Sequence, residues 1–126
     1  MHILVLDDNA ALRNTVVEIL KAYDHNADAT GDARNAVKMV EATEYDFVLV
    51  DYKMPINDGI WFMKNAKLHR RTRVLLMTAH VTNDLISQMF KLGAVGYLIK
   101  PFDAKELIRH IEFHSGQQPP PSPQAP

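Results

Sequence analysis

The sequence predicts an α/β fold in which five parallel strands form one doubly wound sheet with helices on both faces. Five short runs, four of them of consecutive apolar residues, alternate with longer segments whose apolar residues recur every three or four positions. The short runs are typical of strands covered on both faces, and the recurring pattern is typical of amphipathic helices. Strands joined through helices run parallel, and the right-handed crossover rule then places helices on both faces.

The expected strands differ in how deeply they are buried. Four are apolar and suit buried positions, whereas the second is short and polar and suits an edge of the sheet, where one side faces water. The first and third each end directly before an acidic residue. The five expected strands are residues 3–6, 26–30, 47–50, 73–78 and 95–99.

Local signals mark where the helices begin and end. Asp8 or Asn9 is placed to cap the first helix, a break at Gly31 precedes the second, Pro55 and the turn after it precede the third, and Asp103 caps the last. The five expected helices are residues 10–23, 33–43, 60–68, 83–92 and 104–114.

Composition sets the domain count but names no partner. The 126 residues suit a single domain, which we expect to span residues 1–116. A net charge of −1 gives no general attraction to nucleic acid or to an acidic membrane. The absence of cysteine excludes disulfides and thiolate metal sites, and we expect a cytoplasmic location.

Neither end of the sequence resembles a signal peptide or a membrane-spanning segment. The apolar start, of only about five residues, is too short for a signal peptide or a membrane span. Residues 117–126 contain five prolines and no large apolar residue. We therefore expect residues 117–126 to form a disordered tail or the stub of a linker.

Polar residues that are scattered along the chain follow the ends of several expected strands. They are Asp7, Asp8, Asp51, Thr78 and Lys100. Because the carboxyl ends of parallel strands lie on one edge of the sheet, we expect these side chains to converge there.

The three carboxylates of this edge favour a hard cation. Like charges crowded together require a proton or a cation to neutralise them. Oxygen ligands favour Mg²⁺, which keeps positions open for water and for phosphate oxygens. An ammonium and a hydroxyl beside such an ion are suited to hold the oxygens of a transferred phosphoryl group, so the edge indicates phosphate chemistry on one of the acids.

These motifs together resemble those of response regulator receiver domains. The motifs occur in the family's order: the acidic pair Asp7 and Asp8, Asp51 followed by MPINDG, Thr78 followed by Ala79, and Lys100–Pro101–Phe102. The match extends from residue 2 to about residue 115. The resemblance implies a flavodoxin-like fold with strand order 2-1-3-4-5.

The resemblance also implies a role for each residue of the edge. Asp51 corresponds to the phosphoacceptor, which takes a phosphoryl group from the phosphohistidine of a sensor histidine kinase or phosphotransfer protein. Asp8, Asp51 and the backbone carbonyl of Lys53 would bind Mg²⁺, with Asp7 acting through a water molecule. Lys100 and Thr78 would hold phosphoryl oxygens. This describes a signalling domain that catalyses only its own phosphorylation and dephosphorylation, and not an enzyme.

In this family, phosphorylation alters a binding surface that is separate from the phosphorylation site. The resemblance implies that Thr78 moves toward the phosphoryl group and that Tyr97 changes rotamer. Both movements would alter the face made by the fourth helix, the fifth strand and the last helix. That face would bind an unidentified output domain or target protein, and it is compatible with a homodimer. The isomer of the Lys100–Pro101 bond is left open by the sequence.

Two other functions fit the fold class less well. A flavodoxin-like nucleotide or flavin carrier needs glycines and hydroxyls in the first loop, where Asp7 and Asp8 would repel a phosphate. A small Mg²⁺-dependent phosphohydrolase needs a second acid two residues after Asp51, where the sequence has Lys53. Lys53 and His80 instead occupy positions that flank the phosphoryl site in receiver domains.

Simpler interpretations exist for individual residues. Asp7 and Asp8 taken alone would serve as a helix cap, and Tyr97 alone would be an ordinary core aromatic. The basic residues from Lys64 to Arg73 span a helix end and a loop and lack interleaved aromatics. We therefore interpret that segment as a solvated face, and we expect no direct nucleic-acid or membrane binding by this domain.

Overall fold

The structure is a computed structural model that describes residues 1–115, and the tail expected at residues 117–126 lies outside the described residues. Strands and helices alternate throughout. The elements are β1 (His2–Leu6), α1 (Ala10–Ala22), β2 (Asn26–Thr30), α2 (Ala33–Ala42), β3 (Phe47–Asp51), α3 (Gly59–Asn65), β4 (Arg73–Thr78), α4 (Asn83–Lys91), β5 (Ala94–Ile99) and α5 (Ala104–His114).

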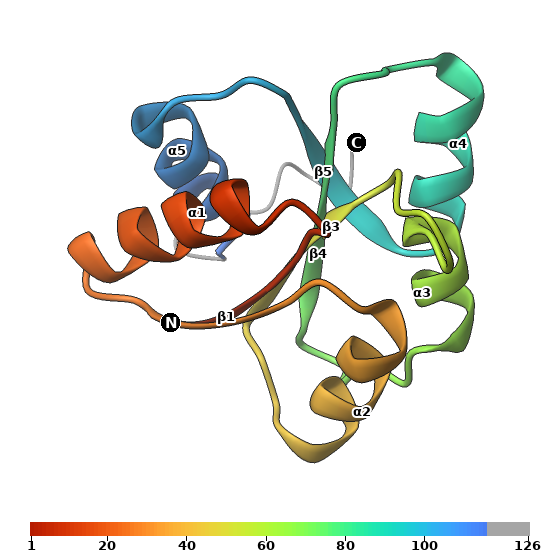
Figure 1. Cartoon of the computed structure of the whole chain (residues 1–126), viewed down its shortest axis with the longest axis horizontal. Coiled ribbons are helices and arrows are strands. Elements are labelled where there is room, and N and C mark those ends of the chain that lie inside the picture. Colours follow the sequence, from red (N-terminus) through yellow and green to blue (C-terminus); the bar gives the residue numbers. More distant parts are fainter. Residues whose placement is uncertain (116–126) are drawn as a thin grey trace.

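The strands form one parallel sheet in the order β2-β1-β3-β4-β5. This confirms both the α/β class and the strand order that the resemblance implied. Helices α1 and α5 cover one face of the sheet, and α2, α3 and α4 cover the other (Figure 1). The polar strand β2 lies at one edge, as its sequence predicts, and β5 lies at the other.

The core consists of two apolar layers, one on each face of the sheet. Successive side chains of a strand point to opposite faces. Leu4 and Leu6 of β1 therefore pack with Phe62 of α3 on one face, whereas Ile3 and Val5 pack with helices α1 and α5 on the other. This double coverage explains why the inner strands are apolar without alternation.

The helix ends show which of the predicted boundaries are correct. Asn9, and not Asp8, caps α1, because its side chain accepts a hydrogen bond from the backbone N–H of Leu12 at 3.0 Å. Helix α3 ends at Asn65, earlier than the predicted residue 68. The Asn65 side chain donates to the carbonyl of Trp61 at 2.8 Å, and the backbone at Ala66 is extended. Asparagine competes in this way with the hydrogen bonds that would continue a helix.

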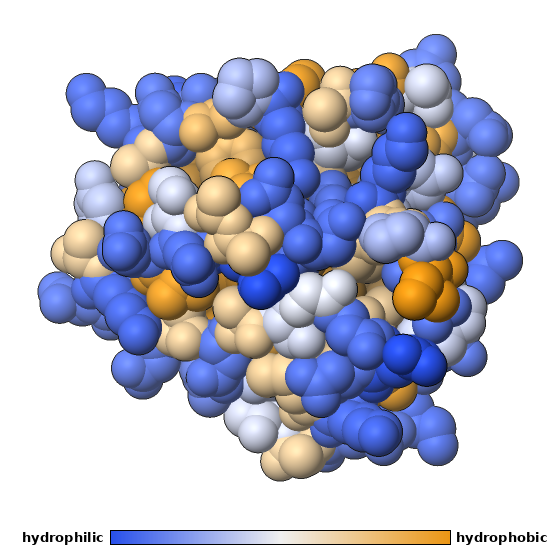
Figure 2. Space-filling model, viewed as in Figure 1, coloured by the Kyte–Doolittle hydropathy of each residue, from blue (hydrophilic) through white to orange (hydrophobic). Residues whose placement is uncertain are grey.

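The exterior is mixed in polarity. On the face shown in Figure 2, hydrophilic residues predominate and hydrophobic residues form small separate patches. Within residues 1–115, no helix has the length and apolar character needed to cross a membrane.

Gly59 lets α3 begin close behind the end of β3. A Cβ added at Gly59 would lie 3.0 Å from the Asp51 carbonyl oxygen and 3.1 Å from the Tyr52 Cα. Its backbone N–H donates to the Tyr52 carbonyl at 2.9 Å. The lack of a side chain at Gly59 therefore helps to fix the backbone that carries Asp51.

We expect Gly59→Ala to lower the free energy of unfolding by ~1–3 kcal/mol, because the added methyl group would press on backbone atoms that move little. Gly31→Ala is the matched control. There the nearest atom, at 2.6 Å, is a terminal nitrogen of the Arg13 side chain, which can move aside at the cost of one hydrogen bond to the Asp7 carbonyl. Chemical denaturation of both variants measures the difference, and an equal or larger loss for Gly31→Ala would contradict this account.

Candidate functional site

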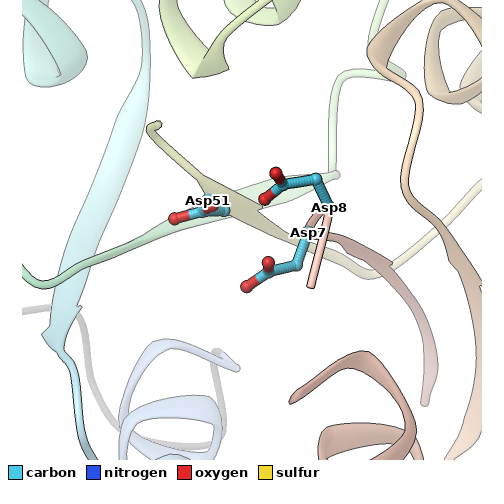
Figure 3. A group of neighbouring side chains, drawn as sticks. All are labelled: Asp7, Asp8 and Asp51. Atoms are coloured by element: carbon cyan, nitrogen blue, oxygen red, sulfur yellow. The ribbon is translucent and has the colours of Figure 1, made fainter. Parts of the chain in front are cut away.

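The ends of β1 and β3 bring three carboxylates together. The two strands are neighbours, and Leu6 pairs with Val50, so the residues that follow these positions emerge side by side. Asp7 and Asp8 come from the end of β1 and Asp51 from the end of β3, with their carboxylates directed to the same side (Figure 3). Each offers an oxygen atom, and these atoms all lie within 4.8 Å of one another.

The three acids differ in burial. Asp7 has no exposed surface and Asp51 is 5% exposed, whereas Asp8 is exposed. Both carboxylate oxygens of Asp7 accept hydrogen bonds: the backbone N–H of Asn9 donates to one at 2.9 Å, and the Lys100 ammonium donates to the other at 2.8 Å. Asp7 is thus a fixed part of the structure, and Asp8 remains open to solvent.

Lys100 reaches this cluster from the end of β5. Its Nζ atom lies 2.8 Å from an Asp7 oxygen and 3.1 Å from an Asp51 oxygen, so one ammonium bridges two buried acids. The backbone N–H of Lys100 donates to the Thr78 carbonyl at 2.9 Å, which joins the ends of β4 and β5. The Lys100–Pro101 peptide bond is cis.

Burial and charge shift the protonation of the cluster. Burial, followed by the negative charge of Asp7, raises the pKa of Asp51 to about 6, although Lys100 opposes this shift. Burial alone would lower the pKa of Lys100, but its hydrogen bonds to Asp7 and Asp51 outweigh that effect and hold the pKa above its ordinary value. Lys100 therefore stays charged, and the pKa of Asp51 is raised by burial and by the neighbouring carboxylates.

The cluster fits a hard divalent cation. One ammonium offsets only one of the three carboxylate charges. Only oxygen donors converge at this point, which matches the preference of Mg²⁺ and not that of metals that select sulfur or imidazole. The exposed Asp8 leaves the cluster accessible from solvent, and Lys53 follows Asp51 in the exposed β3–α3 loop.

Thr78 lies at the same edge, but its hydroxyl is engaged elsewhere. The side chain is buried, its oxygen accepts from the backbone N–H of His80 at 3.0 Å, and its hydroxyl lies 3.3 Å from the His80 carbonyl, to which it donates. Within residues 1–115, no hydrogen bond joins the Thr78 side chain to Asp51 or Lys100. The structure thus brings four of the five predicted edge residues close together and places Thr78 at the end of the neighbouring strand β4.

Tyr97 lies away from the acidic cluster, on the outer strand β5. Its side chain is half-buried, and its ring centre lies 6.4 Å from that of Phe90 on α4. The side chains of Lys53 and His80 are exposed.

Two contacts that hold the cluster were not predicted from the sequence. The Arg13 guanidinium donates to the backbone carbonyl of Asp7 at 2.9 Å, and the Asn9 backbone N–H binds the Asp7 carboxylate. The second has a sequence signal, because an Asp commonly binds the backbone N–H two residues later in a turn. The first has none, because nothing local indicates where a long arginine side chain lies.

Comparisons with known proteins identify what the chain is similar to. The sequence model of the response regulator receiver domain matches residues 3–112. The chain is 34% identical to the transcriptional regulatory protein PdtaR of Mycobacterium tuberculosis, over 89% of this chain and 55% of PdtaR. It is 32% identical to the chemotaxis protein CheY-3 of Vibrio cholerae, over 89% of both chains. The chain thus spans about half the length of PdtaR but most of CheY-3.

Solved structures show the same fold. The Vibrio cholerae chemotaxis protein CheY4 superimposes with a TM-score of 0.84 at 23% identity, covering 89% of this chain and 96% of CheY4. The receiver domain of a Pseudomonas aeruginosa sensor histidine kinase superimposes with a TM-score of 0.81 at 25% identity, covering 91% of this chain and 97% of that domain. That domain was solved with a magnesium ion coordinated in its active-site cleft.

The raised pKa of Asp51 predicts a gain in stability when its charge is removed. Because the pKa is about 6 in the folded chain and 3.8 in the reference state, ionisation of Asp51 disfavours folding, and the cost grows as pH rises through this interval. In buffer that contains a chelator to remove divalent cations, we expect Asp51→Asn to raise the free energy of unfolding by ~1–3 kcal/mol at pH 8, and by much less at pH 4.

Denaturant unfolding at both pH values measures this difference. The control is Asp32→Asn, because the pKa of Asp32 is lowered, mainly by the backbone N–H of Arg34. The Asp32 variant should gain no stability at pH 8. A destabilised Asp51→Asn at pH 8 would show that the Lys100 ion pair outweighs the crowding.

Proposed function

The chain belongs to the response regulator receiver domain family, and we propose that Asp51 is the residue that accepts the phosphoryl group. The observation that carries this proposal is the placement of Asp51. It is buried at the end of β3, with the Lys100 ammonium 3.1 Å away and oxygens of Asp7 and Asp8 within 4.8 Å. Asp7 has similar neighbours, but it is fully buried and both of its carboxylate oxygens already accept hydrogen bonds, from the Asn9 backbone N–H and the Lys100 ammonium.

The transfer follows from these neighbours. An ionised Asp51 oxygen attacks the phosphorus of a phosphohistidine, the new P–O bond forms as the P–N bond breaks, and the donor histidine keeps the bonding electrons. With a pKa of about 6, Asp51 is mainly ionised at neutral pH and can act as the nucleophile. Lys100 lies close enough to bind an oxygen of the incoming group, and this contributes to the self-catalysed step that we propose.

Mg²⁺ fits the same arrangement, and the receiver domain of the Pseudomonas aeruginosa kinase supports it. We propose that Asp8, Asp51 and the carbonyl of Lys53 hold the ion and that Asp7 acts through a water molecule. When bound, Mg²⁺ supplies positive charge that offsets the negative charge of the phosphoryl oxygens. The described residues around Asp51 otherwise offer only the ammonium of Lys100 for that purpose.

We propose that Thr78 and Tyr97 transmit the change. The Thr78 hydroxyl would leave the His80 backbone and bind a phosphoryl oxygen, and the space it vacates would admit a new position of Tyr97. The α4, β5 and α5 face would then bind a target protein, an output domain or a second copy of the chain. Exposed apolar side chains on that face, Phe90, Val95 and Ile99, support this assignment.

The donor would be a sensor histidine kinase or a phosphotransfer protein, and we place the domain at residues 1–116 in the cytoplasm. The similarity to PdtaR, of which this chain covers 55%, shows that a receiver can be joined to further sequence. A flavin carrier or a phosphohydrolase gains no support, because two acids, Asp7 and Asp8, occupy the first loop and the exposed Lys53 follows Asp51.

We expect a small-molecule phosphodonor and Mg²⁺ to add one phosphoryl group to the intact chain. The adduct should be absent from Asp51→Asn and should form far more slowly with Mg²⁺ removed by a chelator. Intact-mass spectrometry measures both effects. Asp46→Asn is the matched control, because Asp46 lies at the start of β3, at the opposite end of that strand from Asp51. An adduct that persists in Asp51→Asn would contradict the assignment.

We expect Thr78→Ala and Tyr97→Ala to keep the adduct and to lose its effect on the output face. Hydrogen–deuterium exchange of residues 83–99, with and without phosphodonor, should change in the parent chain and stay unchanged in both variants. Thr15→Ala, at an exposed position on α1, should behave like the parent chain. If either substitution abolishes the adduct, that residue belongs to the transfer step and not to the switch.

A further inference from the structure

A hollow of about 400 Å³ lies along the free edge of β5, between α4 and α5. It is separate from the acidic cluster and contains two histidines that the proposed function does not use. Its lining residues are Phe90, Gly96, Tyr97, Leu98, Ile99, Glu106, His110 and His114.

Three potential metal ligands of this hollow form one stripe along α5. Glu106, His110 and His114 follow one another at intervals of four residues, so successive turns of the helix place them one above the other. All three are half-buried. Two histidines four apart on one helix face are a common chelating pair for zinc, and imidazole also suits copper and nickel.

The first histidine is held in the form that a metal requires. Nδ1 of His110 lies 2.8 Å from the backbone carbonyl of Glu106. A carbonyl oxygen can only accept, so Nδ1 carries the proton and Nε2 is the ring nitrogen left for a metal. Metal-binding histidines almost always donate their second ring N–H in this way, often to a backbone carbonyl.

The second histidine is half-buried and has no polar partner. Within residues 1–115, no hydrogen bond or ion pair reaches either ring nitrogen of His114 or the side-chain carboxylate of Glu106. The His114 ring packs over Gly96, with Nε2 only 2.7 Å from where a Cβ would lie. Burial, followed by His110 and Arg73, lowers the pKa of His114.

We propose that His110 and His114 form a binding site for a divalent transition metal of the zinc class, with Glu106 as a third ligand. The site goes beyond the proposed receiver function and does not depend on it. Its nitrogen donors select metals different from the Mg²⁺ that suits the three aspartates.

Ligand binding requires the side chains of the three residues to rotate toward one another. Among the described residues, only the aspartate cluster already has three such ligand atoms within 4.8 Å of one another. The His114 ring must therefore turn away from Gly96, and Glu106 must swing toward His110. Exposed and half-exposed side chains change rotamer rapidly, and a zinc–imidazole bond favours the rotated form.

Titration of the full chain with Zn²⁺ in excess Mg²⁺ tests the site by calorimetry. We expect one Zn²⁺ to bind. His110→Gln and His114→Gln should each weaken binding by at least roughly tenfold, since even the loss of a residue that only supports a ligand has such an effect. His69→Gln and His80→Gln, at exposed positions outside the hollow, are the matched controls and should bind like the parent chain.

A spectroscopic measurement separates ligation from loss of folding. In NMR spectra the ring signals of His110 and His114 should shift with Zn²⁺, and those of His69 should not. Circular dichroism should show both glutamine variants folded. Equal affinity in the parent chain and both variants would overturn the proposal. Loss of binding in Asp51→Asn alone would also overturn it, because the ion would then occupy the acidic cluster.

Discussion

Three carboxylates repel one another at one edge of the sheet, and the contacts and protonation of the site depend on how that repulsion is offset. Asp7 is fully buried, so its charge depends on the two donors that reach it, the Asn9 backbone N–H and the Lys100 ammonium. Asp51 shares that ammonium and is left with a raised pKa. A site that is under-neutralised in this way favours a process that brings in positive charge, which is why a divalent cation suits it.

The parallel sheet is what makes such crowding possible. Its strands deliver residues from distant parts of the sequence to one edge, and apolar layers on both faces hold the strands in place. The backbone hydrogen bond from Lys100 to Thr78 joins the ends of β4 and β5. A change at the acidic cluster is thereby linked mechanically to the strand that carries Tyr97 and lines the hollow beside α5.

Much of this arrangement is predictable from the sequence, because it depends on local patterns. Apolar runs and capping residues predict the elements, and the shared edge of parallel strands predicts that Asp7, Asp51 and Lys100 meet. The sequence does not predict the early end of α3 at Asn65, the contact of Arg13 with the Asp7 carbonyl, or the engagement of Thr78 with His80. Each of these depends on a side-chain rotamer or on a competition between hydrogen bonds, which residue type alone leaves undetermined.

The bond between Lys100 and Asp7 joins residues 93 positions apart in the chain. No shorter piece of the protein contains both partners, so this bond requires that β5 has joined the sheet. Closing so long a loop costs little more entropy than closing one of half its length. The order in which the strands are synthesised and assembled therefore matters more than the length of the loop. A chain still emerging from the ribosome would carry Asp51 long before it carries Lys100. The ammonium that bridges Asp7 and Asp51 is thus the last part of the acidic cluster to be synthesised.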